Sequence, residues 1–293
     1  MRGTARATAA ITVVNALTTG IGAAVGIDLD VEATVDVSPP MGASRGLEID
    51  HHCLATPLTR ESVAAALRAF DSDTGRGVTL SLRSRIPAGR GLKSSSAVSC
   101  AIALAVARAL GRSASASEVA RVSAEASVRA GVSATGAFDD ALASLVGGIV
   151  VTDNDRFRLL RHLPMPEGLG VALFVPRVLH PPSPGFLERF RSEAPEGSSA
   201  AELAQNGRWQ EAMTENSILV ERVMGYRYEA LRERVRARGA VAQGVSGMGP
   251  SYAVVAAEGD LARIGATFPR APARRFRLGF SRGPLSRPVP EEA

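Results

Sequence analysis

The chain contains very little cysteine and no long apolar run. Only Cys53 and Cys100 occur in 293 residues, which argues against a disulfide framework and excludes a zinc cluster built from cysteines. This cysteine usage fits a reducing compartment, and we expect a cytoplasmic protein. The longest apolar run, residues 97–107, is too short to span a bilayer, so we expect no membrane partner and no signal peptide.

Lysine is almost absent as well. Lys93 is the single lysine, so nearly all of the 34 basic residues are arginine, and the net charge is +5. The resulting pI of about 10.0 would suit a nucleic-acid partner. The arginines are dispersed, however, and the densest stretch, residues 232–238, has the spacing of a solvated helix face. We therefore expect no nucleic-acid partner; a steep salt dependence of DNA or RNA affinity would contradict this.

The remaining composition is that of a globular protein, with 45% hydrophobic and 22% charged residues. Strand and helix patterns are mixed without regular βα alternation, which predicts an α+β fold. A Pro-rich stretch suggests a division near residues 170–185. We expect an N-terminal part over 1–170, a C-terminal part over 171–282 and a disordered tail over 283–293.

Periodicity predicts most of the elements. Strict alternation over residues 27–38 predicts a half-buried strand, and Ser115 with Glu118 forms a possible capping box. Further strands are expected at residues 46–53, 78–83, 147–152, 157–162, 169–175, 241–245, 252–256 and 275–280. Helices are expected at residues 59–70, 94–110, 118–130, 137–146, within 199–238, and at 261–268; the one ending at Leu110 is apolar nearly all round and should be buried.

The first candidate for chemistry is the loop from Gly89 to Ala97. A glycine-rich loop that leads into a helix offers free backbone N–H groups and the positive end of a helix dipole, which suits a triphosphate. Lys93 adds a charge, and the serine hydroxyls can bind phosphate or Mg²⁺. The Walker pattern is absent because Leu92, and not glycine, precedes Lys93. The alternative is a run of N-cap residues before a core helix.

Three other segments have both a functional and a structural interpretation. Asp139 and Asp140 open an apolar helix, either as a proton acceptor or metal ligand, or only to compensate the helix dipole. The glycine-rich residues 244–251 form either a binding loop or a plain hairpin turn. Residues 15–26 contain Asn15 and several glycines, either for a ligand or for a turn.

Together these segments resemble the GHMP small-molecule kinases. Residues 86–97 resemble their second motif, roughly PxxxGLxSSA, and residues 244–251 resemble their glycine-rich third motif. The resemblance is closer to the archaeal-type shikimate kinases of that superfamily. Three features carry it, namely Ile86-Pro87 with Gly91 to Ala97, Thr135 to Ala141, and Val14-Asn15-Ala16 followed by glycines.

The resemblance implies the two-part α+β GHMP fold, which is not a P-loop fold, with the nucleotide between the halves. It implies transfer of the γ-phosphoryl group of ATP to the 3-hydroxyl of shikimate, with Mg²⁺. Residues of the second motif would bind ATP: Pro87, Gly89, Arg90, Gly91, Leu92, Lys93, Ser94, Ser95, Ser96 and Ala97. Ser96 and Glu125 would ligate the metal.

The resemblance also implies the catalytic and substrate-binding groups. Asp139 would be the base, from its Gly-x-x-Asp spacing, with Asp140 as the alternative and Lys93 beside them. The acceptor would lie against Asn15, Gly136, Asp139, Gly247 and Gly249. A carboxylate on the acceptor should meet an arginine, and Arg45, Arg83 and Arg85 are candidates among which the sequence does not choose.

Other functions remain open at this stage. Another GHMP kinase, for homoserine, mevalonate or pantoate, would share the fold and the phosphoryl chemistry. A non-catalytic ATP-binding sensor would share only the fold, although a sensor has no need of the paired acids. The sequence leaves the oligomeric state open.

Overall fold

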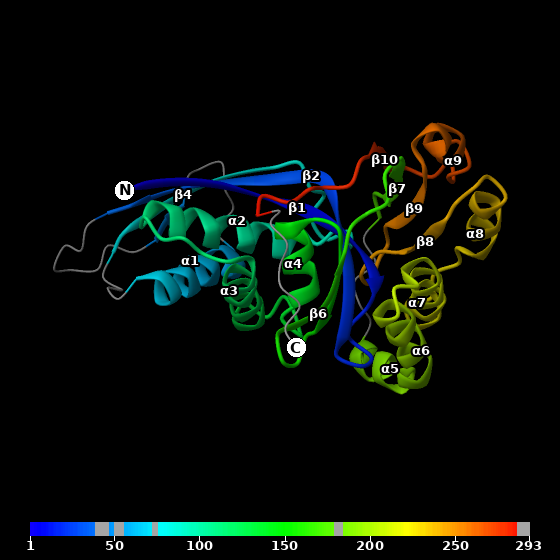
Figure 1. Cartoon of the computed structure of the whole chain (residues 1–293), viewed down its shortest axis with the longest axis horizontal. Coiled ribbons are helices and arrows are strands. Elements are labelled where there is room, and N and C mark those ends of the chain that lie inside the picture. Colours follow the sequence, from blue (N-terminus) through cyan, green and yellow to red (C-terminus); the bar gives the residue numbers. More distant parts are fainter. Residues whose placement is uncertain (39–46, 50–55, 72–75, 179–183, 286–293) are drawn as a thin grey trace.

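Two β-sheets with helices packed against them make up the chain (Figure 1). The computed structural model describes residues 1–38, 47–49, 56–71, 76–178 and 184–285. Within these ranges the elements form a mixed α+β arrangement. None of the helices in the described part of the chain is both long and apolar enough to cross a membrane.

The first sheet is organised around one long strand. It contains β1 (Arg2–Val14), β2 (Ile21–Val37), β3 (Leu47–Ile49), β4 (Val78–Ser84), β5 (Ile149–Asp153) and β6 (Arg158–Leu163). The order is β3-β4-β2-β5-β6, with β1 antiparallel along β2 and with β3 parallel to β4. Strand β2 pairs with β5 through residues 21–25 and with β4 through residues 31–37. One edge of β2 therefore carries β4 and β5 in succession, and the other edge carries β1.

Four helices lie along one face of this sheet in Figure 1. They are α1 (Pro57–Phe70), α2 (Ser94–Ala109), α3 (Ala116–Arg129) and α4 (Phe138–Val146). Helix α2 is buried over most of its circumference, as its apolar sequence predicts. The expected capping box at the start of α3 is confirmed, because Ser115 and Glu118 bond each other's backbone N–H groups.

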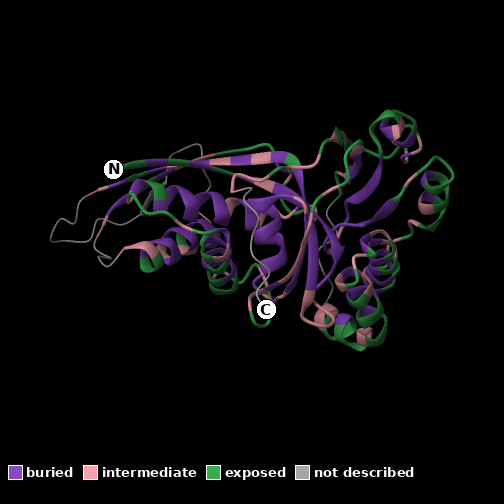
Figure 2. Cartoon of the chain, in the orientation of Figure 1, coloured by how far each residue is buried: buried purple, intermediate pink, exposed green. Residues whose placement is uncertain are grey.

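The burial of β1 and β2 changes along their length. Residues 27–37 of β2 alternate between buried and more exposed positions, which confirms the predicted half-buried strand. Residues 22–26 of β2 and residues 9–14 of β1 are buried on both faces. Helices α6 (Ala194–Gln205) and α7 (Trp209–Met224), which belong to the part of the chain that carries the second sheet, pack on these ends. The two strands therefore run from an open sheet into the junction between the two parts (Figure 2).

The second sheet has the order β10-β7-β9-β8 and is antiparallel throughout. Its strands are β7 (Leu169–Pro176), β8 (Ala242–Val245), β9 (Tyr252–Ala257) and β10 (Ala273–Leu278). The helices of this part are α5 (Phe186–Ser192), α6 (Ala194–Gln205), α7 (Trp209–Met224), α8 (Glu229–Arg236) and α9 (Leu261–Gly265), with a short 3₁₀ turn at Glu258–Asp260. A second hydrophobic core, which includes Phe174, Tyr252 and Val235, lies between them.

Some expectations from the sequence were incomplete or wrong. Strand β1 was not predicted. The tail was expected to be disordered from Gly283, but residues 283–285 pack on α4, where the Leu285 amide donates to the Leu145 carbonyl (2.9 Å). Residues 286–293, and the expected strand beyond Ile49, lie outside the described residues. The second sheet begins at Leu169, but the division into parts 1–170 and 171–282 stays a prediction.

Candidate active site

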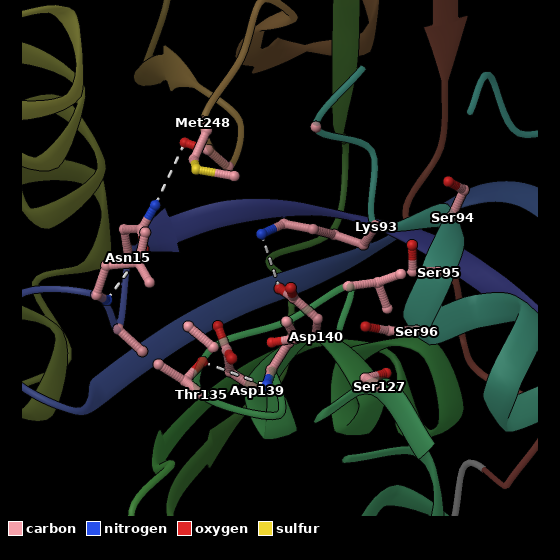
Figure 3. A pocket seen from close by; sticks show the side chains of 18 of the residues that line it. Asn15, Lys93, Ser94, Ser95, Ser96, Ser127, Thr135, Asp139, Asp140 and Met248 are labelled. Atoms are coloured by element: carbon pink, nitrogen blue, oxygen red, sulfur yellow. Dashed lines mark hydrogen bonds and ion pairs between the residues drawn. The ribbon is translucent and has the colours of Figure 1, made fainter. Parts of the chain in front are cut away.

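A cavity of about 470 Å³ is lined by residues of both parts of the chain (Figure 3). The first part contributes residues 15–17 after β1, the start of α2 with the loop before it, the end of α3 with the loop after it, and the start of α4. The second part contributes Phe186 and Leu187 of α5, and Gly247 with Met248 from the turn after β8. Segments far apart in the sequence thus converge on one hollow.

Two helices begin at this cavity without side-chain caps. Lys93 precedes α2 and Ala137 precedes α4, and both adopt the left-handed conformation, with φ of 58° and 53°. Neither helix has a side-chain cap, whereas α1 and α3 each have a complete capping box. The first helical bond of α2 runs from the Ala97 amide to the Lys93 carbonyl (3.0 Å), so the amides of residues 94–96 are available to a ligand. The start of α2 therefore has the free donors that an anion site needs.

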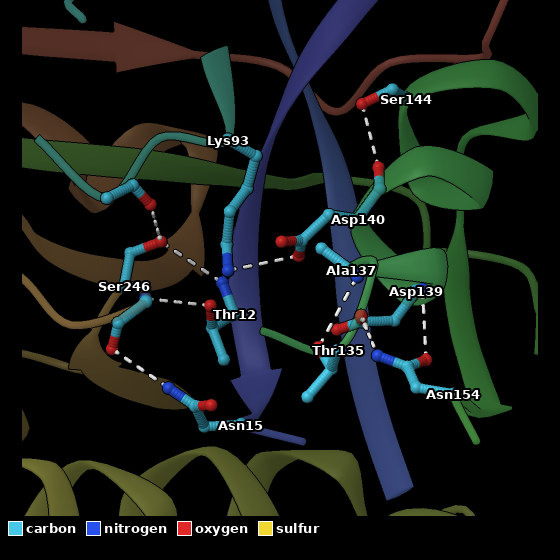
Figure 4. A network of polar contacts seen from close by, with 12 residues as sticks. Thr12, Asn15, Lys93, Thr135, Ala137, Asp139, Asp140, Ser144, Asn154 and Ser246 are labelled. Atoms are coloured by element: carbon cyan, nitrogen blue, oxygen red, sulfur yellow. Dashed lines mark hydrogen bonds and ion pairs between the residues drawn. The ribbon is translucent and has the colours of Figure 1, made fainter. Parts of the chain in front are cut away.

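The loop before α2 is held against the glycine-rich turn of the second part (Figure 4). Ser246, fully buried, donates from Oγ to the Gly91 carbonyl (2.6 Å) and accepts from the Thr12 amide (3.1 Å). The Gly247 amide donates in turn to Thr12 Oγ1 (2.8 Å). Gly91 has a φ of 79°, and a Cβ there would lie 2.0 Å from the Ser246 carbonyl oxygen. Only glycine permits this approach.

Asp140 and Lys93 form an ion pair inside the cavity. Lys93 Nζ lies 3.0 Å from Asp140 Oδ1, and both side chains are largely buried. Burial raises the pKa of Asp140 to about 7, and the charge on Asp139 adds to this effect while Lys93 opposes it. Among the described residues that line the cavity, Lys93 is the only cation. A carboxyl with a raised pKa beside a buried ammonium group is suited to accepting a proton near neutral pH.

Asp139 also lines the cavity, but other groups fix its carboxylate. Asn154, in the turn after β5, donates from Nδ2 to Asp139 Oδ1 (2.8 Å) and accepts from the Asp139 amide (3.3 Å). The carboxylate lies against Gly22 of β2, where a Cβ atom would be 2.6 Å from Asp139 Cγ. Asp139 is therefore held from two sides by the backbone and by Asn154, whereas Asp140 is held by the ammonium group of Lys93.

Most predicted site residues meet in this cavity. The lining includes Asn15, Gly89, Gly91, Lys93, Ser94, Ser95, Ser96, Asp139, Asp140 and Gly247. Asn15 donates weakly from Nδ2 to the Gly247 carbonyl (3.4 Å), and its amide donates to Asn216 (2.8 Å). The three serines occupy the first turn of α2 and do not cap it, because the N-cap position belongs to Lys93.

Other predicted residues do not line the cavity. Leu92 and Ala97 belong to the hydrophobic core, and Gly249 packs against the Tyr226 ring. Gly136 allows the turn before α4 through its φ of 76°. Pro87 and Arg90 also lie outside the lining residues; the Arg90 carbonyl accepts a hydrogen bond from the Ser251 amide (3.4 Å).

Glu125 is not brought to the cavity. It lies on the exposed side of α3, where it pairs with Arg68 and Arg129, each at 3.0 Å. Of the expected arginines, Arg83 and Arg85 do not line the cavity either. Arg85 pairs with Asp30 (2.6 Å), Arg83 lines a separate shallow hollow over β1, β2 and β4, and Arg45 lies outside the described residues. We therefore withdraw Glu125 as a metal ligand, and Arg83 and Arg85 as groups for the acceptor carboxylate.

The sequence also missed several residues of the cavity. Ser127, Phe186 and Leu187 line it, and Asn154 holds Asp139 from outside the lining. No local pattern marks Phe186 and Leu187, because only the packing of the second part brings α5 here. Asn154 lies in the turn of the β5–β6 hairpin, and a turn position gives no local sign that its side chain holds a carboxylate. Residues 131–135 follow α3 as a loop whose length and glycine could have suggested a binding segment.

Comparison with known proteins was made on both sequence and fold. Residues 61–148 match the family described as GHMP kinases N terminal domain. The chain is 38% identical to a shikimate kinase of Pyrococcus furiosus, over 88% of this chain and 93% of that protein. It is 35% identical to a shikimate kinase of Methanococcoides burtonii, over 86% of each chain.

Solved structures show the same fold at low identity. A homoserine kinase from Cytophaga hutchinsonii superimposes with a TM-score of 0.70 at 18% identity, covering 97% of each chain. The Methanococcus jannaschii mevalonate kinase gives a TM-score of 0.69 at 12% identity, covering 96% of this chain and 99% of that one. The expected α+β architecture of the GHMP type is confirmed.

Proposed function

Because the chain belongs to the archaeal shikimate kinases of the GHMP kinase superfamily, we propose that it transfers the γ-phosphoryl group of ATP to the 3-hydroxyl of shikimate. It is an ATP-dependent small-molecule kinase. The observation that carries the chemistry is the buried Lys93–Asp140 pair beside the uncapped start of α2. The choice of shikimate as acceptor is supported by the identity of 35–38% to shikimate kinases.

The start of α2 and Lys93 are the proposed phosphate site. Three amides, three serine hydroxyls and one ammonium group converge there, from Lys93 to Ser96. Phosphoryl transfer has a loose transition state, so catalysis depends mainly on positioning and on stabilising charge. A set of donors held in place by the fold does both without reorganising.

We assign the general base to Asp140, although the sequence favoured Asp139. The Asp140 carboxylate would take the proton of the acceptor hydroxyl as its oxygen bonds to the γ-phosphorus and ADP leaves. Lys93 Nζ, 3.0 Å from Asp140 Oδ1, would contact the phosphoryl oxygens. Asp139, held by Asn154, would orient the acceptor by accepting a hydrogen bond from it. The raised pKa of Asp140 supports this division of roles.

Mg²⁺ fits the residues of this site. Ser96 is buried and lines the cavity, and the described residues contain no cluster of three His, Cys, Asp or Glu side chains. A metal here would therefore be ligated by the Ser96 hydroxyl and by oxygens of ATP itself, an arrangement typical of Mg²⁺. When bound, it would neutralise phosphate charge. A cytoplasmic location, suggested by the few cysteines, is likewise proposed.

The test is to identify the product by ³¹P NMR with ATP, Mg²⁺ and shikimate. We expect a new phosphate monoester with the wild type. Asp140→Asn should lower kcat by about 10²- to 10⁴-fold, the usual contribution of a general base, while ATP still binds. Asp139→Asn, the matched neighbour, should mainly raise the KM for shikimate. The reverse pattern would return the base to Asp139, and binding of ATP without any ester would contradict the proposed activity.

A further inference from the structure

Ser127, in the last turn of α3, carries a hydroxyl for which the protein provides no partner. Its side chain is 1% exposed, and Oγ is fully buried without a hydrogen bond to any described residue. The residue nevertheless lines the cavity. A buried hydroxyl left without a partner is unfavourable, and in functional proteins such an atom often awaits a ligand.

Three other helical serines of the described residues bond the backbone of their own helix. Ser62, Ser144 and Ser198 each donate to the backbone carbonyl four residues earlier, at 2.7, 2.8 and 2.9 Å. This bond is the ordinary solution for a serine inside a helix. Ser127 does not make it, so its hydroxyl remains free to point elsewhere.

The surroundings of Ser127 indicate which ligand it meets. Helix α3 packs against α2, whose start is the proposed phosphate site, and against α4. In Figure 3, Ser127 lies below Ser96 and beyond Asp140, on the side of the cavity opposite Asn15. Successive residues turn by about 100° around a helix, so Ser127 faces nearly opposite to Glu125. The acid therefore lies on the solvent side of α3, and Ser127 lies on the side that borders the cavity.

We propose that Ser127 Oγ donates a hydrogen bond to a phosphate oxygen of the bound nucleotide. The proposal rests on the proposed function, since it assumes that ATP occupies this cavity. An O–H group matches the non-bridging oxygens of a phosphate, which only accept. Helix α2 would hold the phosphates at its start, and α3 would contact them from a second direction.

The test compares Ser127→Ala with Ser123→Ala by calorimetric titration with ATP and Mg²⁺, without acceptor. Ser123 is the matched control because it lies one turn earlier on α3 and its Oγ is likewise buried without a hydrogen-bond partner among the described residues, but it does not line the cavity. We expect Ser127→Ala to raise the Kd for ATP about 10-fold, the usual loss for a hydrogen bond to a charged group. Ser123→Ala should change it less than about twofold.

Two further measurements make the outcome specific. The affinity for adenosine, which has no phosphate, should be the same in Ser127→Ala and the wild type, and the melting temperature without ligand should not fall. An unchanged Kd for ATP in Ser127→Ala would overturn the inference and leave solvent as the partner of this hydroxyl. A parallel loss for adenosine would also overturn it. Failure of the wild type to bind ATP would instead refute the proposed function.

Discussion

Lys93 combines three unusual properties in one residue. It is the only lysine of the chain, it adopts a left-handed backbone conformation, and its ammonium group is buried against Asp140. The left-handed region costs a residue with a Cβ about 1–2 kcal/mol, and such strain tends to persist at functional sites. At Lys93 the left-handed conformation directs the backbone into α2, and the side chain extends to Asp140 of α4.

Single residues of the site were predictable where a motif carried them. Lys93, the serines and both acids stand in recognisable segments, and all of them line the cavity. The sequence could not show which face of its helix Glu125 occupies. Two side chains that are two positions apart on a helix point in nearly opposite directions, so a small error in the alignment to the motif turns a cavity residue into a surface residue. The choice between Asp139 and Asp140 was also beyond the sequence, since it depends on Asn154 and Lys93 as neighbours in space.

The pH dependence of kcat/KM for shikimate should report Asp140. Burial and the charge of Asp139 disfavour its ionised form, so it binds a proton at higher pH than an exposed aspartate. Only the unprotonated carboxylate can act as a base. We therefore expect activity to fall as the pH drops through about 7, the value to which the pKa of Asp140 is raised.

Asp139→Asn provides the internal control for this profile. Removing the neighbouring negative charge should lower the pKa of Asp140 and shift the acidic limb to lower pH. Other ionisations, such as that of ATP, are the same for both proteins and cancel in the comparison. An acidic limb at the same pH in wild type and variant would show that Asp140 does not control it.

At the scale of elements, the four helices packed around the first sheet begin in two different ways. Helices α1 and α3 are capped by their own side chains, whereas α2 and α4 begin at the cavity with their first amides uncapped.

Periodicity predicted these helices well, because each buries one face or its whole surface. Strand β1 is hard to recognise because residues 9–14, buried on both faces, lose the alternation, and the buried positions of its first half are only glycine and alanine. Sheet order depends on pairings between distant segments, which no local pattern records.

The turn after β8 is joined to the loop before α2 through one side chain. Ser246→Ala should leave the Thr12 amide without its acceptor and the Gly91 carbonyl without its donor. Leaving such buried groups unpaired costs about 1–3 kcal/mol. We expect a lower melting temperature and a KM for ATP raised several-fold, because Gly91 belongs to the proposed phosphate loop.

Ser144→Ala is the control for this prediction. Ser144 is also fully buried, but its hydroxyl donates within its own helix, to the Asp140 carbonyl. It should therefore affect the KM for ATP much less than Ser246→Ala. Equal effects of the two variants on the KM would mean that the contact between loop and turn does not position the phosphate site.

At the scale of the whole molecule, the cavity exists only because two parts of the chain meet. Strands β1 and β2 extend into the junction, and residues of α5 and of the turn after β8 complete the lining. Motifs from the first part therefore predict the phosphate chemistry better than the acceptor. The surfaces that select the acceptor come partly from segments without a recognisable pattern, such as Phe186 and Leu187.

The central claim is that this junction phosphorylates shikimate. The most direct test is ATP consumption by the purified protein with Mg²⁺, measured separately with shikimate, homoserine, mevalonate and pantoate. We predict turnover with shikimate at a kcat/KM at least about 10²-fold above the other three, since a site built to hydrogen-bond its substrate rejects analogues strongly. Turnover with another of these acceptors, or ATP binding without any turnover, would contradict the account.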